Sequence, residues 1–240
     1  EHHLAISPEP SARRSFLDCF GNRITKIHFT GDHEYLEIVS EFWVALRDRP
    51  KPSAAAAKVP WEAVRDSLRY RADRKFPPDH LQATAFRFVS TNVPIDSQYA
   101  AYAREAFLPG RPLVEAADAL MRMIHRDFKF DASATETFTP VEQAFKARRG
   151  VCQDFSHIMI ACLRSVGLAA RYMSGYILTH PPEGKERLVG ADATHAWVAV
   201  FVPDFGWLEL DPTNALRADR EHITLGWGRD FSDITPMRGV

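Results

Sequence analysis

Cysteine is scarce in this sequence. Three cysteines occur among 240 residues, namely Cys19, Cys152 and Cys162. An odd and low number argues against a framework of disulfides and is typical of a protein in a reducing compartment. No Cys-x-x-Cys pair and no Cys/His spacing matches a zinc site, so we expect neither a metal ion nor a cofactor.

Long apolar runs and an excess of charge of either sign are also missing. No segment approaches the ~20 apolar residues that span a bilayer, and the first residues lack the basic and apolar regions of a signal peptide. Lys and Arg number 30 and Asp and Glu number 31, which gives a net charge of −1. We therefore expect a cytoplasmic protein with no nucleic-acid or membrane partner, whose oligomeric state stays open.

The first fifth of the chain has the composition of β structure. Residues 24–29 and 35–44 are rich in β-branched and aromatic side chains and predict two strands. The composition then changes at a segment rich in Pro and Ala. We predict a small β domain, a linker and a larger second domain, which occupy residues 1–50, 51–59 and 60–240.

Helical patterns dominate the chain after Pro60. One helix is expected to begin at Pro60 and a second near Pro112, because proline is tolerated in the first turn. The second carries an apolar stripe, made of Leu113, Ala116, Ala117, Leu120, Ile124 and Phe128. A third should be capped by Thr139 with Glu142 as its capping-box partner, and Gly150 should end it in a left-handed conformation.

Cys152 is expected to begin a further helix that runs to about Val166 and ends at Gly167. Its apolar positions have the spacing of a buried stripe, formed by Phe155, Ile158, Met159, Cys162, Leu163 and Val166. At the start of this helix the Cys152 sulfur would lie among unsatisfied N–H groups near the positive end of the helix dipole, and both features favour the thiolate. The alternative is a small buried apolar side chain, which is how we interpret Cys162.

Residues 193–202 and 206–211 predict a β-hairpin that carries a histidine and an aspartate. His195 precedes Pro203 by eight residues and Asp211 follows it by eight. A hairpin symmetric about Pro203 would place these two side chains opposite each other on one face, within reach of a hydrogen bond. Asp192 and Glu209 are the rival carboxylates, the first with the wrong parity and the second in need of a shifted register.

Four motifs resemble the bacterial transglutaminase-like family, whose core has the papain-like fold. They are GVCQDFSH, ARYMSGY, THAWVAVF and GWLELDPTN. The resemblance covers roughly residues 76–240 and implies an α+β fold, in which a Cys-bearing helix packs on an antiparallel sheet. It assigns Cys152 as the nucleophile, His195 as the base and Asp211 as the third catalytic residue. Residues 1–50 are similar to the later part of the family's N-terminal β domain, which implies that this domain is partial.

A nucleophile, a base and an orienting carboxylate are what thiol-dependent acyl transfer requires. We expect Cys152 to attack the amide of a peptide or protein, to form a thioester and to have it resolved by water or by an amine, with water favoured. The Cys152 N–H would stabilise the oxyanion, with Gln143 and Gln153 as candidates for a second donor. The alternatives are a peptide-binding module that retains the fold without catalysis, and a scaffold with a buried cysteine.

Overall fold

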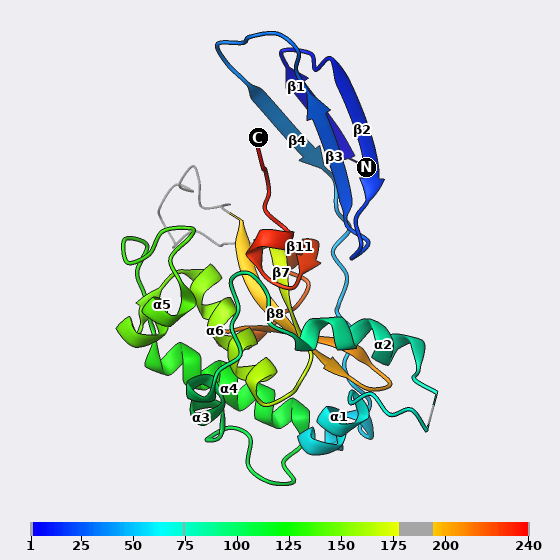
Figure 1. Cartoon of the computed structure of the whole chain (residues 1–240), viewed down its shortest axis with the longest axis vertical. Coiled ribbons are helices and arrows are strands. Elements are labelled where there is room, and N and C mark those ends of the chain that lie inside the picture. The colour runs from blue at the N-terminus through cyan, green and yellow to red at the C-terminus, as the bar shows by residue number, and fades with distance from the viewer. Residues whose placement is uncertain (1, 74, 178–193, 240) are drawn as a thin grey trace. The chain divides into compact units, whose positions relative to one another are not determined.

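The computed structural model describes residues 2–73, 75–177 and 194–239 of the chain. It divides into two compact units, Glu1–Asp48 and Arg49–Val240 (Figure 1). The segment predicted as a linker, residues 51–59, is part of the second unit. It contains the short 3-10 helix Ala56–Lys58, and Ala56 is buried in the main core.

The first unit consists of four strands that form two antiparallel pairs. β1 pairs with β4 and β2 with β3, and their bounds are His2–Ser7, Ala12–Leu17, Arg23–His28 and Glu37–Phe42. The strands predicted at residues 24–29 and 35–44 therefore both form, the second two residues shorter at each end. Asp18 fixes the turn between β2 and β3 by accepting hydrogen bonds from the backbone N–H groups of Phe20 and Asn22, each 2.8 Å long.

Six α-helices lie in the described part of the second unit. They are α1 to α6, with the bounds Trp61–Ser67, Pro78–Thr84, Ser97–Ala103, Leu113–Asp127, Val141–Ala147 and Cys152–Ser165. Two further 3-10 helices span Ala85–Arg87 and Phe231–Asp233. Pro60 and Pro112 immediately precede α1 and α4 as predicted, and the whole apolar stripe expected on α4 is buried.

The predicted capping of α5 is wrong. Pro140 occupies the cap position and no side chain caps the helix. The Thr139 hydroxyl instead accepts a hydrogen bond from the Glu136 N–H in the preceding turn, and Glu142 pairs with Lys146 one turn later. A proline side chain has no oxygen that could accept a hydrogen bond from the N–H groups of the first turn.

A five-stranded antiparallel sheet forms the second layer of this unit. Its order is β10-β9-β8-β7-β11, and β7 to β11 span Ala170–Ile177, His195–Val202, Gly206–Asp211, Leu216–Arg217 and His222–Gly228. Two further short strands, β5 (Lys129–Phe130) and β6 (Arg149–Gly150), pair in parallel. That pairing ties the residues just before Cys152 to the end of α4.

α6 is the central helix of the unit. It packs against β7 and β8 on one side and against α3, α4 and α5 on the others (Figure 1). Every residue from Asp154 to Arg164 is therefore buried, whereas the sequence predicted a single buried stripe. The Arg164 guanidinium is accommodated by donating to backbone carbonyls, among them those of Phe86 and Ala170. Gly167 ends the helix with φ at +90°, as predicted.

We find no membrane-spanning helix among the described residues, because none combines the required length with sufficient hydropathy.

Candidate active site

Cys152 is the first residue of α6, and its position is fixed from both sides. The parallel pairing of β5 with β6 holds the preceding residues. From inside the helix, the buried Asp154 carboxylate accepts a hydrogen bond of 2.8 Å from the Val151 N–H and one of 2.6 Å from the Thr135 hydroxyl. Asp154 thus completes the helix N-terminus, where a carboxylate is favoured by the helix dipole. Cys152 is a half-buried free thiol.

The left-handed residue after α5 is Arg148 rather than Gly150. Arg148 has φ at 54°, and its guanidinium lies 4.6 Å from the ring centroid of Phe145 and 4.7 Å from that of Phe128. These cation–π contacts offset the cost of a left-handed arginine. Gly150 is needed for a different reason: a Cβ at this position would lie 2.5 Å from an oxygen of Asp154. The glycine therefore permits the close approach of the carboxylate that organises the start of α6.

His195 and Asp211 meet, but not in the predicted register. Val198 pairs with Leu210 and Val202 with Gly206, so the hairpin is centred on Asp204, not on Pro203. In this register the residue opposite Asp211 is Trp197, and His195 is its diagonal neighbour. A shift of two residues keeps both side chains on one face of the sheet. The His195 Nε2 consequently lies 2.8 Å from the Asp211 Oδ2.

The His195 ring connects Asp211 to the cysteine. Because Nε2 contacts Asp211, Nδ1 is the nitrogen left for the Cys152 thiol, whose interaction with the imidazole contributes to the raised pKa of His195. Burial by itself lowers the pKa of His195, but the hydrogen bonds and charges of Asp211 and Cys152 outweigh burial and raise that pKa to about 9. The site therefore favours an imidazolium at neutral pH.

Asp211 is fully buried and surrounded by donors. Its Oδ2 accepts from His195, from the Asn214 side chain at 2.6 Å and from His222 at 3.2 Å. Its Oδ1 accepts from the backbone N–H groups of Thr213 and Asn214. Burial raises the pKa of Asp211, but the hydrogen bonds from the two histidines, together with the His195 charge and the Asn214 amide, hold it far below the ordinary value.

His222 is a residue of this site that the sequence analysis did not identify. It begins β11 and is buried. Besides its contact with Asp211, its Nδ1 lies 3.3 Å from Asp219. The sequence gives no signal for this residue, because a histidine at the start of a strand has no fixed spacing from the other motifs.

The rival carboxylates do not replace Asp211. Glu209 accepts a hydrogen bond of 2.6 Å from the Trp197 indole N–H and pairs with Arg49. Glu209 lies on the same side of the sheet as the His195–Asp211 pair. Its carboxylate is bound by Trp197 and Arg49, not by His195. Asp192 lies outside the described residues.

Of the two glutamines considered as oxyanion donors, Gln153 is already engaged. Its side-chain amide donates to the Thr137 carbonyl at 2.8 Å. Gln143 is exposed on α5, and no contact joins it to Cys152 within the described parts of the chain. The Cys152 backbone N–H remains available, because the first residue of a helix has no carbonyl four residues earlier to bind.

One group of three possible metal ligands occurs among the residues that the structure describes. It consists of His195, Asp211 and His222. Both histidine nitrogens lie at hydrogen-bond distance from the same carboxylate oxygen, 2.8 and 3.2 Å away. Hydrogen bonds from the two histidines to Asp211 account for both distances and for the lowered pKa of Asp211. We therefore interpret the group as a hydrogen-bonded network.

The other two cysteines lie apart from this network. Cys162 is completely buried in the core cluster, and burial raises its pKa far above the ordinary value. This agrees with its interpretation as a core side chain. Cys19 is exposed in the first unit.

Comparison with known proteins identifies the family. The model of the transglutaminase-like superfamily matches residues 100–212, and that of the bacterial transglutaminase-like N-terminal region matches residues 1–45. An uncharacterized protein of Mycobacterium tuberculosis is 41% identical over 245 residues, which cover 100% of this chain and 75% of that protein. The chain belongs to the transglutaminase-like superfamily. The family resemblance inferred from the four motifs is therefore confirmed.

Two further relatives of this transglutaminase-like protein bear on its fold and chemistry. A solved structure of a candidate cysteine protease from Cytophaga hutchinsonii covers 98% of this chain and 72% of its own, with a TM-score of 0.65 at 18% identity. It confirms the predicted α+β, papain-like fold. A protein-glutamine gamma-glutamyltransferase of Pseudomonas aeruginosa is 32% identical over 113 residues, 46% of this chain and 17% of that protein. Superfamily membership indicates thiol-dependent chemistry on amide bonds.

Proposed function

We propose that Cys152, His195 and Asp211 are a catalytic triad that hydrolyses amide bonds of peptides or proteins through a thioester. The observation that carries this proposal is the position of the His195 imidazole, which contacts the buried Asp211 carboxylate and whose pKa is raised by both Asp211 and the Cys152 thiol. The thiol lies at the N-terminal end of a helix whose residues 154–164 are all buried. A nucleophile held in this way is pre-organised for attack.

The reaction begins with attack of the Cys152 thiolate on the amide carbonyl carbon. As the tetrahedral intermediate collapses, the C–N bond breaks and the His195 imidazolium donates its proton to the leaving amine. Water then attacks the thioester while His195 accepts one of its protons. The C–S bond breaks, the carboxylic acid leaves, and the thiolate–imidazolium pair is restored. The Cys152 N–H stabilises the oxyanion in both halves of the reaction.

Asp211 holds His195 in the tautomer and orientation that this sequence requires. An ionised carboxylate only accepts hydrogen bonds, so it binds the protonated Nε2 of His195 and directs Nδ1 to the thiol. Its charge also stabilises the imidazolium that forms during catalysis. The five donors around Asp211 keep this carboxylate ionised while it is buried.

The glutamine side chain is the amide that we propose to test first. The Pseudomonas aeruginosa relative is a protein-glutamine gamma-glutamyltransferase by name, which supports a γ-carboxamide as acyl donor. Transfer of the acyl group to an amine instead of water uses the same thioester. We favour water because no acceptor site for an amine was recognised in the sequence.

Mass spectrometry of a glutamine-containing peptide library tests this function. Wild-type protein should convert glutamine to glutamate or cleave peptide bonds, and added hydroxylamine should intercept the thioester as a hydroxamate. A Cys19→Ser variant should behave like the wild type, since that cysteine is exposed in the other unit. Absence of hydrolysis, of amine adducts and of hydroxamates across the library would favour a binding module without catalysis.

The activity should decline in alkaline solution with a midpoint near pH 9. The pKa of His195 is raised above its ordinary value to about 9, so the imidazolium persists at neutral pH and is lost as the pH rises through 9. The leaving amine then has no proton donor, and kcat/KM falls. The measurement is kcat/KM for an amide substrate from mildly acidic to strongly alkaline buffer. A constant rate through pH 9 would argue against protonation of the amine by His195.

A further inference from the structure

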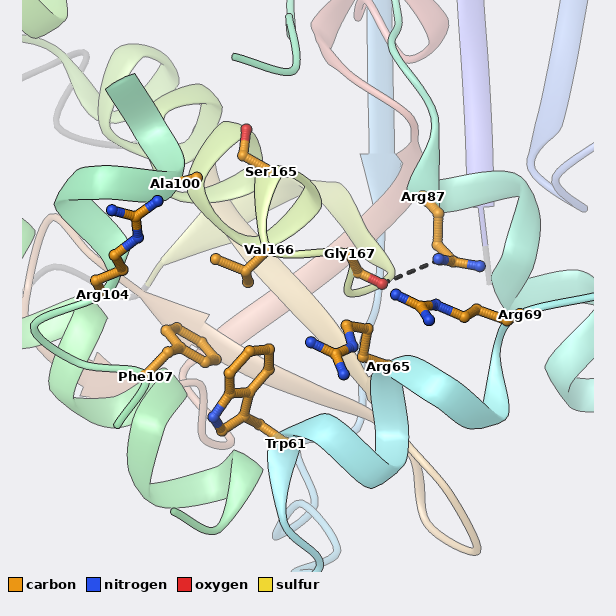
Figure 2. Close-up of a pocket in the computed structure, with 10 residues that line it drawn as sticks. All are labelled: Trp61, Arg65, Arg69, Arg87, Ala100, Arg104, Phe107, Ser165, Val166 and Gly167. Carbon is orange, nitrogen blue, oxygen red and sulfur yellow. Dashed lines mark hydrogen bonds between the residues drawn. The ribbon is translucent and has the colours of Figure 1, made fainter. Parts of the chain in front are cut away.

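A pocket lies at the opposite end of α6 from the candidate active site. It has a volume of about 370 Å³, and the residues at the C-terminal end of the helix, Ser165, Val166 and Gly167, line it (Figure 2). Since α6 has 14 residues and an α-helix rises about 1.5 Å per residue, some 20 Å separate this pocket from Cys152. No residue of the proposed catalytic triad lines it.

Among the residues that the structure describes, four arginines and no carboxylate line this pocket. They are Arg65, Arg69, Arg87 and Arg104. Figure 2 shows the first three gathered near Gly167 and the fourth at the other end of the pocket. This concentration of positive charge contrasts with the net charge of −1 of the whole chain, and it creates a local field that attracts anions.

The charges of the three gathered arginines are only partly neutralised by the protein. The Asp66 carboxylate binds Arg65 through two contacts of 2.9 and 3.2 Å and lies 3.5 Å from Arg69. Arg87 instead donates to the backbone carbonyls of Gly167 and Leu68. Among the described residues, Asp66 thus faces three guanidinium groups, and Glu62 adds its charge at Arg65 alone. Burial, followed by the positive charge of Arg69, lowers the pKa of Arg87, and a bound anion would relieve that repulsion.

Aromatic rings form the part of the pocket between the arginines. Trp61 and Phe107 meet edge to face with their centroids 5.5 Å apart, and the Arg65 guanidinium lies 5.1 Å from the Trp61 ring centroid. Val166 extends this apolar surface. A ligand that fills the pocket therefore needs an anionic end and an apolar or ring-shaped part.

We propose that this pocket binds an organic phosphate monoester. The phosphate would contact Arg65, Arg69 and Arg87 through the N–H groups that the protein leaves free, because charge-assisted hydrogen bonds from guanidinium groups to phosphate oxygens are strong and a dianion balances the excess charge better than a single carboxylate. The organic part would lie against Trp61 and Phe107. A volume of about 370 Å³ is within the range of small-molecule sites.

Isothermal titration of the full chain with adenosine monophosphate, inorganic phosphate and adenosine tests the proposal. The monophosphate should bind, inorganic phosphate should bind more weakly, and adenosine should not bind measurably. Arg69→Gln should weaken binding by about tenfold or more, since it removes a hydrogen-bond donor to a charged group. Arg122→Gln, an equal loss of charge at an exposed site on α4, should leave the affinity unchanged. Equal affinities in both variants would overturn the proposal.

The reactivity of Cys152 distinguishes binding in this pocket from binding at the candidate active site. Saturating adenosine monophosphate should not slow alkylation of Cys152 by iodoacetamide, because the two sites lie at opposite ends of α6. Protection of Cys152 combined with normal binding in Arg69→Gln would place the nucleotide at the candidate active site and refute the pocket assignment. The outcome is independent of amide hydrolysis, since binding is measured without turnover.

Discussion

Replacing Cys152 with alanine is expected to lower amide hydrolysis by about 10⁴-fold or more. No other nucleophile can form the thioester at the start of α6, because the next cysteine, Cys162, is completely buried. The fold should survive, since Cys152 is only half-buried and alanine is the best helix former. The measurements are kcat/KM for an amide substrate, and the circular dichroism spectrum and Tm of the same preparation.

Iodoacetamide provides a second measurement of the same residue. Wild-type protein should lose activity in step with alkylation of Cys152, and Cys19→Ser should lose it at the same rate. Activity of Cys152→Ala within tenfold of wild type would remove this cysteine from the mechanism, as would full activity after complete alkylation.

Side-chain parity explains why the pairing of His195 and Asp211 could be predicted although its register could not. The sequence places both residues at odd positions on strands joined by a tight turn, and any even shift of register keeps them on one face. The centre of the turn depends on backbone angles that the sequence leaves open. Asp204 and Gly206 both adopt positive φ angles, and together they move the centre from Pro203 to Asp204.

The position of His222 beside Asp211 depends on the path of the chain between β10 and β11. The periodicity of the sequence cannot predict that path. β10 and β11 lie at opposite edges of the sheet. The chain that joins them contains Ala218, which packs with Met173 and Trp197. This cluster is separate from the core cluster that contains the α6-facing residues of the sheet. The connection thus crosses this face of the sheet and delivers His222 to Asp211. Such a long-range return has no local sequence signal.

Segments distant in sequence likewise explain two polar residues buried in α6. A stripe of apolar residues was sufficient to predict this helix, but His157 and Arg164 are buried as well. Their burial becomes acceptable through partners such as the Phe86 and Arg229 carbonyls, to which Arg164 donates. For example, His157 Nε2 accepts from the Phe231 N–H, 74 residues away.

Replacing Asp211 with asparagine is expected to lower kcat/KM by about 10³- to 10⁴-fold. Asparagine has the same shape, but it carries no charge and turns one acceptor into a donor. It therefore cannot stabilise the imidazolium of His195 or fix its tautomer. The alkaline limit of activity should also move from about pH 9 toward the ordinary pKa of histidine, ~6.5. The measurement is the pH profile of kcat/KM.

A His222→Gln variant is the matched control, because glutamine can still donate to Asp211. The altered hydrogen bond reaches His195 only through the Asp211 carboxylate. The decrease in kcat/KM should therefore stay within about tenfold. The alkaline limit should remain near that of the wild type. Equal losses in the two variants would mean that Asp211 acts mainly by holding the two histidines and the turn in place. A far greater loss in Asp211→Asn, with its shifted pH profile, would separate the electrostatic role of the carboxylate from its structural one.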